Sequence, residues 1–530
     1  MQRSSIQLLF YCFLMTLFLL GESPDFGSER PERYFRFPMK SREELHEITR
    51  IISIDNVVND TVYAYANRQE YEQFKALDKT VEMLMPPSLK YKPKMSGTME
   101  KSQIMDSYPT YEAYRNMMIQ FAADYPGICR IDSVGASVQG RGIFFAVISD
   151  NVQKEEAEPE VLYTSSMHGD ETVGYILMLR LIDEFLSNYG TDQQITEMVD
   201  GLEIWINPLA NPDGTYYAGN STIFGATRYN ANAVDLNRNF PNPVEGEHPD
   251  GNPWQPETVA MMELAERQNF VLSANVHGGA ELLNYPWDCF ERRHADDAWL
   301  IWLCRQYADT VHSNSPAGYL TDRENGISNG WDWYDVYGSR QDYMTYYRHC
   351  REVTMELSDT KLLPESELNA YWDYNRNAFL NYLSAALTGI RGEIRTDWDL
   401  GAMQISIIGH EQDNSWIVPD ENVGDYYRLC LPGVYQLEII SGSELVTIEN
   451  ISIDVEPSVR VNVITGTTIP GDINGDNDIN IADVLLIQNY IMDQIIPGDF
   501  EFDMADWNND STLNQDDLDQ IIQFLLNLYP

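Results

Sequence analysis

The stretch Ser165-Ser-Met-His-Gly-Asp-Glu-Thr-Val-Gly174 joins two apolar segments of different length. Residues 161–164 form a short apolar run typical of a buried strand, and residues 173–187 form an apolar run of helix length. His168 and Glu171 stand three positions apart at this junction, and where a helix begins this spacing places both side chains on one face. Imidazole and carboxylate are ligands of catalytic zinc, which takes a third protein ligand and keeps one position for water. The stretch therefore predicts part of a metal site.

The third ligand is expected at His277, in Ser273-Ala-Asn-Val-His-Gly-Gly279, because an apolar strand leads into it and flexible glycines follow. The other histidines of the mature chain lack this setting. A second His-x-x-Glu pattern, His349-Cys-Arg-Glu352, stands in an extended segment without a glycine turn, and we interpret it as structural.

A hydrolytic metal site also needs a base that activates water. Val353-Thr-Met-Glu-Leu357 places Glu356 inside an apolar strand, where burying a carboxylate is costly unless it has a function or a partner. The alternative is a core glutamate in a salt bridge. The segment from Arg228 to Phe240 carries two arginines among several amides, which favours carboxylate binding, since arginine offers a rigid fork of donors. By itself this segment could also be a surface loop.

Composition limits the class of protein. The chain has 530 residues, 43% of them hydrophobic, and a formal net charge of −47. Its length predicts several globular domains, and its charge repels nucleic acid and favours cationic ligands or calcium, or else only confers solubility. Residues 1–21 combine one arginine with a short apolar core, which predicts a secretory signal or, alternatively, a retained anchor. No later stretch is apolar enough to span a membrane, and no Cys-x-x-Cys pattern indicates a sulfur-ligated metal.

The remaining chain divides into four parts. Residues 22–105 predict a small α+β module, either a pro-segment or an accessory domain, ending in an exposed linker at residues 86–94. Residues 106–388 alternate strands and helices, which predicts an α/β domain with a mixed, mostly parallel sheet that binds ligands at the carboxyl ends of its strands. Residues 389–466 carry short strands separated by turn residues, one of them at residues 459–463, and predict a β-sandwich.

Residues 467–530 contain a repeat, with oxygen-bearing side chains at positions 1, 3, 5, 9 and 12 of two loops and an apolar helix after each loop. Hard oxygen ligands on a tightly wound loop are typical of calcium sites. The predicted calcium ligands are Asp472, Asn474, Asp476, Asn480 and Asp483 in the first loop and Asp506, Asn508, Asp510, Asn514 and Asp517 in the second.

Four ordered segments carry a resemblance: His168-Gly-Asp-Glu171, Asp235-Leu-Asn-Arg-Asn-Phe-Pro241, His277-Gly-Gly-Ala-Glu-Leu-Leu-Asn-Tyr-Pro-Trp-Asp288 and Thr354-Met-Glu-Leu-Ser358. They resemble zinc metallocarboxypeptidases of the carboxypeptidase N/E subfamily. The resemblance implies one catalytic zinc on His168, Glu171 and His277, with Glu356 as general base and later acid. It also implies that Arg228 stabilises the oxyanion, that Asn237 and Arg238 hold the terminal carboxylate of a peptide or protein substrate, and that Tyr334 is the mobile tyrosine that closes over it.

Specificity follows from the same resemblance. Asp288 matches the subfamily's acid at the base of the specificity pocket, and Gln341 also suits a polar pocket. A buried aspartate would pair with a cationic side chain, so the sequence predicts release of C-terminal Lys or Arg. Asp170, in the middle of the first motif, departs from the family pattern and places a negative charge beside the zinc.

The flanking parts add to the resemblance. The β-sandwich is similar to the transthyretin-like domain of this subfamily, and the repeat resembles a dockerin, the helical module with two calcium loops that binds cohesin domains of a cellulosome scaffold. Asn477 and Ser511 replace the glycine usual in such loops. The sequence thus predicts a secreted, extracellular, scaffold-bound enzyme.

Two other functions stay open. One is a catalytically silent binding module, although His168, Glu171, His277, Arg228 and Glu356 are all present. The other keeps the zinc chemistry but acts on cell-wall peptides or amide-linked amino acids, since the Asp288 pocket would also accept a diamino acid.

Overall fold

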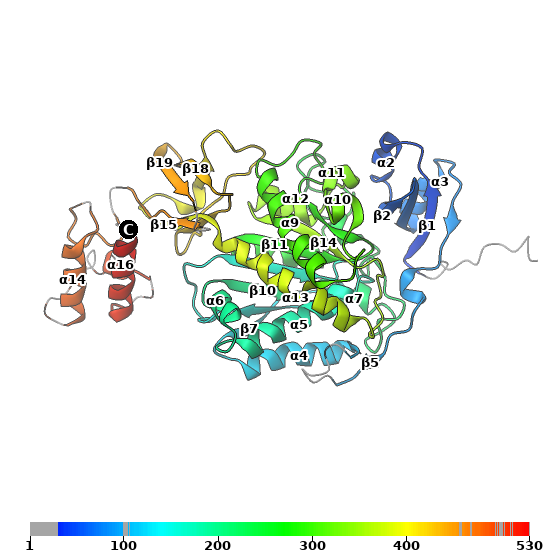
Figure 1. Cartoon of the computed structure of the whole chain (residues 1–530), viewed down its shortest axis with the longest axis horizontal. Coiled ribbons are helices and arrows are strands. Elements are labelled where there is room, and N and C mark those ends of the chain that lie inside the picture. Colours follow the sequence, from blue (N-terminus) through cyan, green and yellow to red (C-terminus); the bar gives the residue numbers. More distant parts are fainter. Residues whose placement is uncertain are drawn as a thin grey trace, which may run out of the picture.

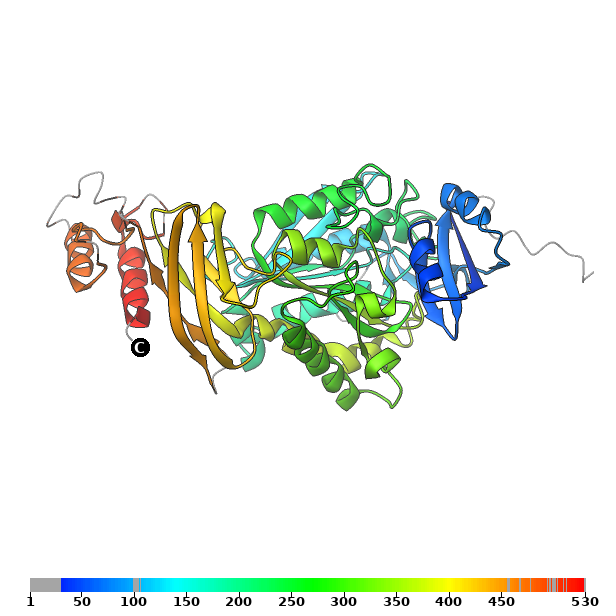
Figure 2. The same ribbon diagram turned by 90° about the horizontal axis from the view of Figure 1, so that it is seen from above.

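The computed structural model describes residues 30–98, 104, 106–454, 458–466, 469–476, 478–492, 494, 497, 502, 504–508, 510 and 512–528. Four units follow one another along the long axis, from the N-terminal module at one end to a pair of helices at the other (Figures 1 and 2). The expected leader, residues 1–21, and the glycine replacements at 477 and 511 lie outside the described residues. Within the described part, no helix combines the length and apolar character that crossing a membrane requires.

The N-terminal module is a four-stranded antiparallel sheet of order β2-β3-β1-β4 with two helices. Its elements are β1 Glu32–Pro38, α2 Arg42–Ile48, β2 Ser53–Val58, β3 Thr61–Asn67, α3 Arg68–Lys75 and β4 Glu82–Met83. Ser41 caps α2 by accepting from the backbone N–H of Glu44, and Asn67 and Glu70 form a capping box at the start of α3. Phe35, Phe37 and Phe74 fill its core.

The prediction of an exposed linker at residues 86–94 is wrong, because Pro86, Ser88 and Pro93 are buried. The hydroxyl of Ser88 donates to the carbonyl of Ala226 at 2.6 Å, and the backbone carbonyl of Ser88 accepts from the N–H of Gly225 at 3.0 Å. Beyond this segment, β5 Met95–Ser96 pairs with β6 Tyr108–Pro109. Prolines favour extended backbone, but an extended segment packs along a neighbouring domain as readily as it crosses solvent.

The α/β domain is built on a sheet of eight strands, of order β13-β12-β14-β11-β9-β10-β8-β7. Strands β14, β11, β9 and β10 are parallel to one another, and antiparallel pairs flank them, which confirms the predicted mixed sheet. The strands are β7 Cys129–Ala136, β8 Gly142–Ile148, β9 Glu160–Ser165, β10 Glu203–Asn207, β11 Phe270–His277, β12 Glu281–Tyr285, β13 Ile327–Asn329 and β14 Arg351–Leu357. The helices are α4 Tyr111–Asp124, α5 Val173–Asn188, α6 Gln193–Val199, α7 Pro212–Thr215, α8 Pro256–Arg267, α9 Asp297–Asn314, α10 Asp322–Asn325, α11 Gly330–Trp333, α12 Arg340–Tyr347 and α13 Leu368–Ser384.

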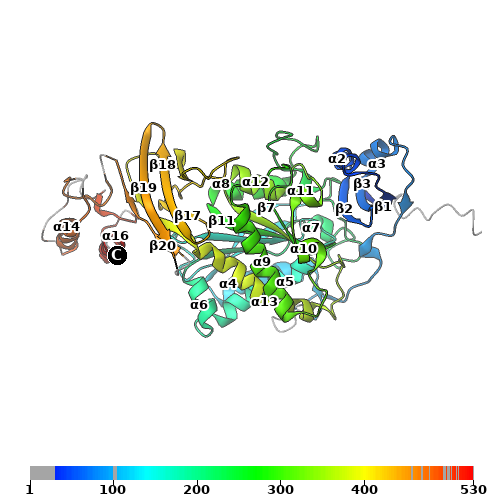
Figure 3. The ribbon, with the colours of Figure 1, turned by 45° about the horizontal axis from the view of Figure 1, so that its top comes forward.

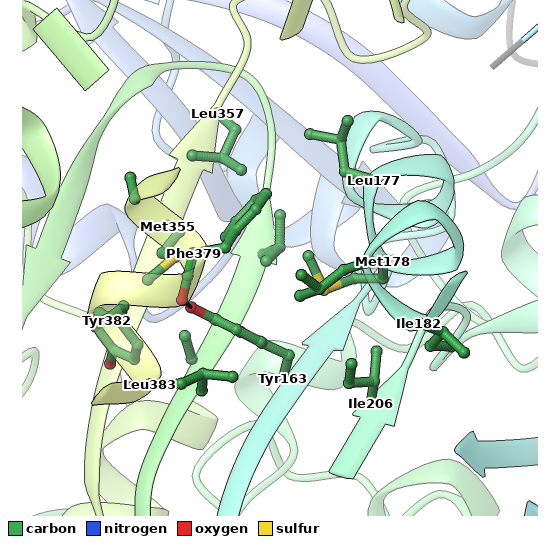
Figure 4. Close-up of a cluster of buried hydrophobic side chains, with 14 of the residues drawn as sticks. Tyr163, Leu177, Met178, Ile182, Ile206, Met355, Leu357, Phe379, Tyr382 and Leu383 are labelled. Carbon is green, nitrogen blue, oxygen red and sulfur yellow. Dashed lines mark hydrogen bonds between the residues drawn. The ribbon is translucent and has the colours of Figure 1, made fainter. Parts of the chain in front are cut away.

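Apolar cores fix the sheet between two helical layers. On one face, Met178 and Ile182 of α5 and Phe379 of α13 pack around Tyr163 of β9, which donates its hydroxyl to the carbonyl of Phe379 at 3.0 Å (Figure 4). On the other face, α8 and α12 form a second core with β8 and β10. Each fully buried large apolar side chain contributes about 1.5–3 kcal/mol, so these layers hold the strand ends in place.

The β-sandwich packs two sheets around one shared core (Figure 3). Its strands are β15 Gly389–Arg395, β16 Met403–Ile407, β17 Asp425–Arg428, β18 Gly433–Ser441, β19 Glu444–Ile453, β20 Ser458–Arg460 and β21 Val463–Ile464. The single strand expected at residues 459–463 is two short strands, both paired with β15. Between them the N–H of Glu393 donates to the side chain of Asn462, which interrupts the backbone pairing.

Buried charges join the sandwich to the α/β domain. Asp296 accepts from Arg351 at 2.6 Å and from Arg428 at 2.8 Å, and all three side chains are almost fully buried. Arg351 opens β14 and Arg428 closes β17, so one carboxylate links the two sheets.

The C-terminal unit pairs α14 Ile481–Ile491 with α16 Gln515–Leu528 around a small core. The guanidinium of Arg395, in the sandwich, lies 3.7 Å from the ring centre of Trp507. Elsewhere in the described part, the five cysteines are all free and buried.

Candidate active site

Three predicted ligands meet at the carboxyl ends of neighbouring strands. His168 and Glu171 follow β9, and His277 is the last residue of β11, which pairs with β9 in parallel. Nδ1 of His168 lies 3.0 Å from Glu171 Oε1, and Nδ1 of His277 lies 2.8 Å from Glu171 Oε2. The two imidazole Nδ1 atoms are 3.1 Å apart, and all three side chains are buried.

The reason expected for the closeness of His168 and Glu171 is wrong. Helix α5 begins only at Val173, so neither residue lies on a helix face. They belong to a tight turn, in which the N–H of Glu171 donates to the carbonyl of His168 at 3.1 Å. A turn and a first helical turn bring residues three apart to similar distances, so the sequence pattern alone could not distinguish them.

The three donor atoms fit zinc. Ligands about 2.0–2.1 Å from a tetrahedral zinc stand roughly 3.3 Å apart, close to the separations of these nitrogen and oxygen atoms. Burial lowers the pKa of His277 to about 4, so its imidazole is neutral and its lone pair free to bind a metal. Two histidines and one glutamate form a ligand set that leaves the fourth position open, as catalytic zinc sites do.

Polar side chains behind the two histidines orient these ligands, and the sequence pattern predicted no role for them. Asp235 lies 3.0 Å from Nε2 of His168 and accepts from Nε of Arg228 at 2.9 Å. On the other ligand, the side-chain amide of Asn275 lies 2.7 Å from Nε2 of His277. Such partners fix the imidazole orientation. Asp235 opens the Asp-Leu-Asn-Arg motif, which was the only signal available for it.

Glu356 lies beside the triad as predicted, in register with His277 across the β11–β14 pair. Its Oε2 is shielded from solvent and has no hydrogen-bond partner within the described chain. Burial and the nearby charge of Glu171 raise the pKa of Glu356, the direction that suits a group that takes up a proton and later returns it. The salt-bridged alternative fits Glu352 instead, which pairs with Arg340 at 2.9 Å.

Arg238 and Asn237 follow in a 3₁₀ turn, Leu236–Arg238. Arg238 uses Nη1 to donate to the carbonyl of Asn237 at 2.9 Å, but its buried Nε and Nη2 find no acceptor in the described part of the structure. The side-chain oxygen of Asn237 accepts from the N–H of Arg340 at 2.9 Å, which holds that amide in place. A buried guanidinium with free donors is suited to a carboxylate ligand.

Asp288 is buried among polar side chains. Its Oδ1 accepts from Gln341 at 3.0 Å and from Asn284 at 3.1 Å. Burial raises the pKa of Asp288 to about 6, and burial together with the charge of Asp288 raises the pKa of Asp342 to about 8. Among the charged side chains of the described chain, Arg238 lies near enough to lower the pKa of Asp288, against the larger effect of burial.

The N-terminal module covers this site. Tyr334 packs against the module's core, and Arg238 lines a cleft whose other wall includes Thr49 and Asn67 of the module. Asp55 of β2 lies 2.6 Å from Nζ of Lys361 and 3.6 Å from Nη1 of Arg228. The hydroxyl of Tyr65 donates to Asp170 at 2.7 Å. Neither Asp55 nor Lys361 carries a sequence signal for this contact.

The two C-terminal loops are wound alike. Asp483 accepts from the N–H groups of Ile473 and Asn480, and Asp517 accepts from those of Trp507 and Asn514. The first residues match too, because Asp472 accepts from the N–H of Asp476 and Asp506 from that of Asp510. Asn474 and Asn508 accept from the N–H groups of Asp476 and Asp510. The other predicted ligands also match in pairs: Asp476 and Asp510 accept from the N–H groups of Asp478 and Thr512, and Asn480 and Asn514 accept from those of Ala482 and Asp516. The two loops therefore share one pattern of side-chain to backbone hydrogen bonds.

Known proteins resemble two parts of the chain. The profile of the zinc carboxypeptidases (Peptidase_M14) matches residues 114–378, and that of the dockerin type I domain matches residues 470–526. Carboxypeptidase M of Mus musculus is 34% identical over 63% of this chain and 77% of its own length. The catalytic chain of Homo sapiens carboxypeptidase N is 36% identical over 58% of this chain and 75% of its own. Carboxypeptidase D of Mus musculus is 35% identical over 65% of this chain, which spans 26% of that longer relative.

Solved structures share the fold. The structure of carboxypeptidase A from Helicoverpa armigera superposes with a TM-score of 0.52 at 17% identity, covering 67% of this chain and 98% of that one. Thrombin activatable fibrinolysis inhibitor gives 0.51 at 16% identity, with the same coverage. With the ordered motifs, the triad and these matches together, the chain belongs to the zinc carboxypeptidase family and carries a dockerin type I domain.

Proposed function

We propose that this chain is a secreted, zinc-dependent carboxypeptidase that releases C-terminal Lys or Arg and is attached to an extracellular scaffold. The observation that carries this proposal is the set of buried groups without partners beside the triad. Glu356 Oε2 and the Nε and Nη2 atoms of Arg238 have no hydrogen-bond partner in the described chain. Leaving such groups unpaired costs about 1–3 kcal/mol each, so a site that keeps them is built for a ligand.

Different residues would bind the metal, transfer the proton and stabilise the developing charge. A zinc held by His168, Glu171 and His277 would lower the pKa of water and polarise the scissile carbonyl. Glu356 takes the proton from water and then delivers it to the leaving amine. Arg228, fixed by Asp235, offsets the charge that develops on the carbonyl oxygen.

Substrate binding explains why the enzyme would act only at chain ends. Arg238 and Asn237 bind the terminal carboxylate, which an internal peptide bond lacks. The side chain of the last residue enters the polar pocket, where Asp288 and Gln341 select Lys or Arg. Tyr334 closes over this residue once the N-terminal module has left.

The N-terminal module would keep the uncleaved enzyme inactive. Asp55, Tyr65 and the cleft wall at Thr49 and Asn67 cover the residues that would bind substrate. We therefore propose that residues 22–105 act as a pro-segment and that activity requires cleavage before the α/β domain at residues 106–388.

The C-terminal parts supply attachment. Apolar side chains on the two dockerin helices are exposed, at 67% for Ile481, 51% for Leu485 and 64% for Leu526, and would form the surface that a cohesin domain covers. The loops from Asp472 and Asp506 would hold two calcium ions. The sandwich of residues 389–466 would be the transthyretin-like domain of this subfamily.

The test uses the full chain with a specific protease site inserted between Gly97 and Asp106. Peptides that differ only in a C-terminal Lys or Phe are offered before and after cleavage, with zinc present or chelated. Release of Lys, dependent on zinc and increased by cleavage, is the expected result. Equal release of Phe would overturn the specificity. Inactivity of the cut, zinc-loaded chain would favour the silent module or the cell-wall hydrolase.

A further inference from the structure

Lys361 is a buried cation beside the predicted zinc ligands, and its closest partner belongs to another unit. Its Nζ lies 2.6 Å from Asp55 Oδ1, 2.9 Å from Glu171 Oε1 and 3.9 Å from Asp170 Oδ1. Its side chain is 2% exposed. Glu171 would share its charge with the metal, and Asp170 lies beyond hydrogen-bond distance. The N-terminal module thus supplies the carboxylate that pairs most directly with this ammonium.

The same module pairs with other donors of the α/β domain. Glu32 accepts from the N–H of Arg228 at 3.1 Å and from the N–H of Tyr229 at 3.0 Å. Glu70 accepts from the hydroxyl of Tyr229 at 2.8 Å. With Asp55 included, three acidic side chains of the module therefore pair with donors of Arg228, Tyr229 and Lys361.

Burying these carboxylates is unfavourable unless the opposite surface provides hydrogen-bond donors or cations. Desolvation raises the pKa of Glu32 to about 7 and that of Glu70 to about 7. The donors on the α/β side include the two fixed cations Arg228 and Lys361, which are placed by Asp235 and Glu171 of their own domain. The surface is therefore complementary to carboxylates independently of the module.

The position of Lys361 indicates which part of a substrate would reach it. Two consecutive residues of α12 join one side of the site, because the N–H of Arg340 donates to Asn237 and the side chain of Gln341 donates to Asp288. The ion pairs of Lys361 are instead with Asp55, Glu171 and Asp170. The C-terminal residue of a substrate would occupy the Arg238 and Asp288 side, and its scissile bond would lie at the triad. The residue before it would then lie on the side of Lys361.

We propose that Lys361 and Arg228 form a subsite for an acidic side chain at the penultimate residue of the substrate, and that Asp55 occupies this subsite in the uncleaved chain. The inference rests on the proposed function, because it needs a peptide whose last residue fills the Asp288 pocket. The preferred substrates would end in Asp or Glu followed by Lys or Arg.

The first measurement is of binding, so that it does not depend on turnover. The cleavable full chain carries Glu356→Gln, is cut, separated from its module and loaded with zinc. Its Kd is measured for two peptides that end in Asp-Lys or Asn-Lys and are otherwise identical. Because the two side chains have nearly the same shape, a difference reports charge. We expect the Asp-Lys peptide to bind at least about tenfold more tightly, as a buried charge-assisted pair provides.

A matched pair of variants assigns the effect to Lys361. Lys361→Gln should bring the ratio of the two Kd values close to one, whereas Lys361→Arg should keep most of it. Since Lys361 contacts Glu171, zinc content is measured in each variant, and the ratio within one variant cancels any general loss of affinity. Equal binding of both peptides by the parent, or an unchanged ratio in Lys361→Gln, would overturn the subsite. Failure of the cut enzyme with Glu356 intact to release Lys, while the ratio holds, would overturn the hydrolase proposal alone.

Discussion

Asp288 ionises at a higher pH than an exposed aspartate, because burial raises its pKa to about 6. Below that pH it is protonated and cannot pair with a cationic side chain. We expect the ratio of kcat/KM for C-terminal Lys over C-terminal Phe to rise between pH 5 and pH 7 and to level off above. The ratio cancels the ionisation of groups that act on both substrates.

Asp288→Asn is the matched control for this prediction. Asparagine keeps the size of the side chain but carries no charge at any pH, so both the Lys preference and its rise with pH should disappear. A ratio that rises equally in this variant would assign the titration to another group.

Asp235 holds both a predicted zinc ligand and the arginine proposed to stabilise the oxyanion, at 3.0 Å from His168 Nε2 and 2.9 Å from Arg228 Nε. Asp235→Asn should therefore weaken zinc binding by about 10–100-fold, the usual effect of losing such a partner. Competition with a chromogenic chelator measures this affinity. Asp213→Asn is the control, since this buried carboxylate pairs with Arg141 and accepts from Ser137, neither of them a zinc ligand. It should lower stability without altering zinc affinity per folded molecule. Equal loss in both variants would contradict the assignment.

Residues with chemistry in a local pattern could be predicted, and residues defined by distant contacts could not. His168, Glu171 and His277 stand at the ends of apolar strands, so a strand pattern and a donor type were sufficient. Lys361 and Asp55 meet across two separate units, and nothing near either in the sequence indicates the other. Tertiary contacts of this kind have no period that a sequence can display.

At the scale of elements, β14 and β17 depend on one shared carboxylate. Arg428→Met removes one of the two guanidinium groups that neutralise the buried Asp296. Breaking a buried pair on one side typically costs about 3–5 kcal/mol. Chemical denaturation should show this loss, and the sandwich should begin to unfold apart from the α/β domain.

A second ion pair across the same junction is the control. Arg292 and Asp413 are 2.6 Å apart, but the arginine side chain is 53% exposed. Arg292→Met should cost less than about 1 kcal/mol, as exposed pairs do. Similar losses in the two variants would mean that burial does not determine the strength of this junction.

Element types were predictable where polar and apolar residues recur regularly, as in β1 and α3, or where an apolar run has the length of a helix, as in α5. The errors fell where backbone conformation and packing separate. Residues 86–94 are extended, as their prolines indicate, yet Ser88 is buried because a neighbouring loop offers it hydrogen bonds at Ala226 and Gly225. Local composition reports the conformation of a segment but not the surface beside it.

At the scale of the whole molecule, the dockerin should respond to calcium while the active site does not. Trp507 contacts Arg395 and, at 5.1 Å, the ring of Phe524, so ordering of the second loop should change its fluorescence. Calcium titration of calcium-free, zinc-loaded protein should change tryptophan emission and leave peptide hydrolysis by the cut chain unchanged.

The two loops provide their own matched variants. Asp517→Ala removes a predicted ligand from the loop that contains Trp507, and Asp483→Ala removes the equivalent one from the other loop. The emission change should vanish in Asp517→Ala and persist, at higher calcium concentration, in Asp483→Ala. Identical behaviour of both variants would contradict separate loops.

The N-terminal module, which covers the active site, and the dockerin lie at opposite ends of an elongated body (Figure 2). The contact of Arg395 with Trp507 joins the C-terminal unit to the sandwich, and the buried charges around Asp296 join the sandwich to the α/β domain. A molecule attached through its dockerin would therefore hold its substrate opening on the side away from the scaffold. The distance between scaffold and substrate opening would be set by the length of the molecule, and the C-terminus of a long polypeptide could enter without passing the attachment point.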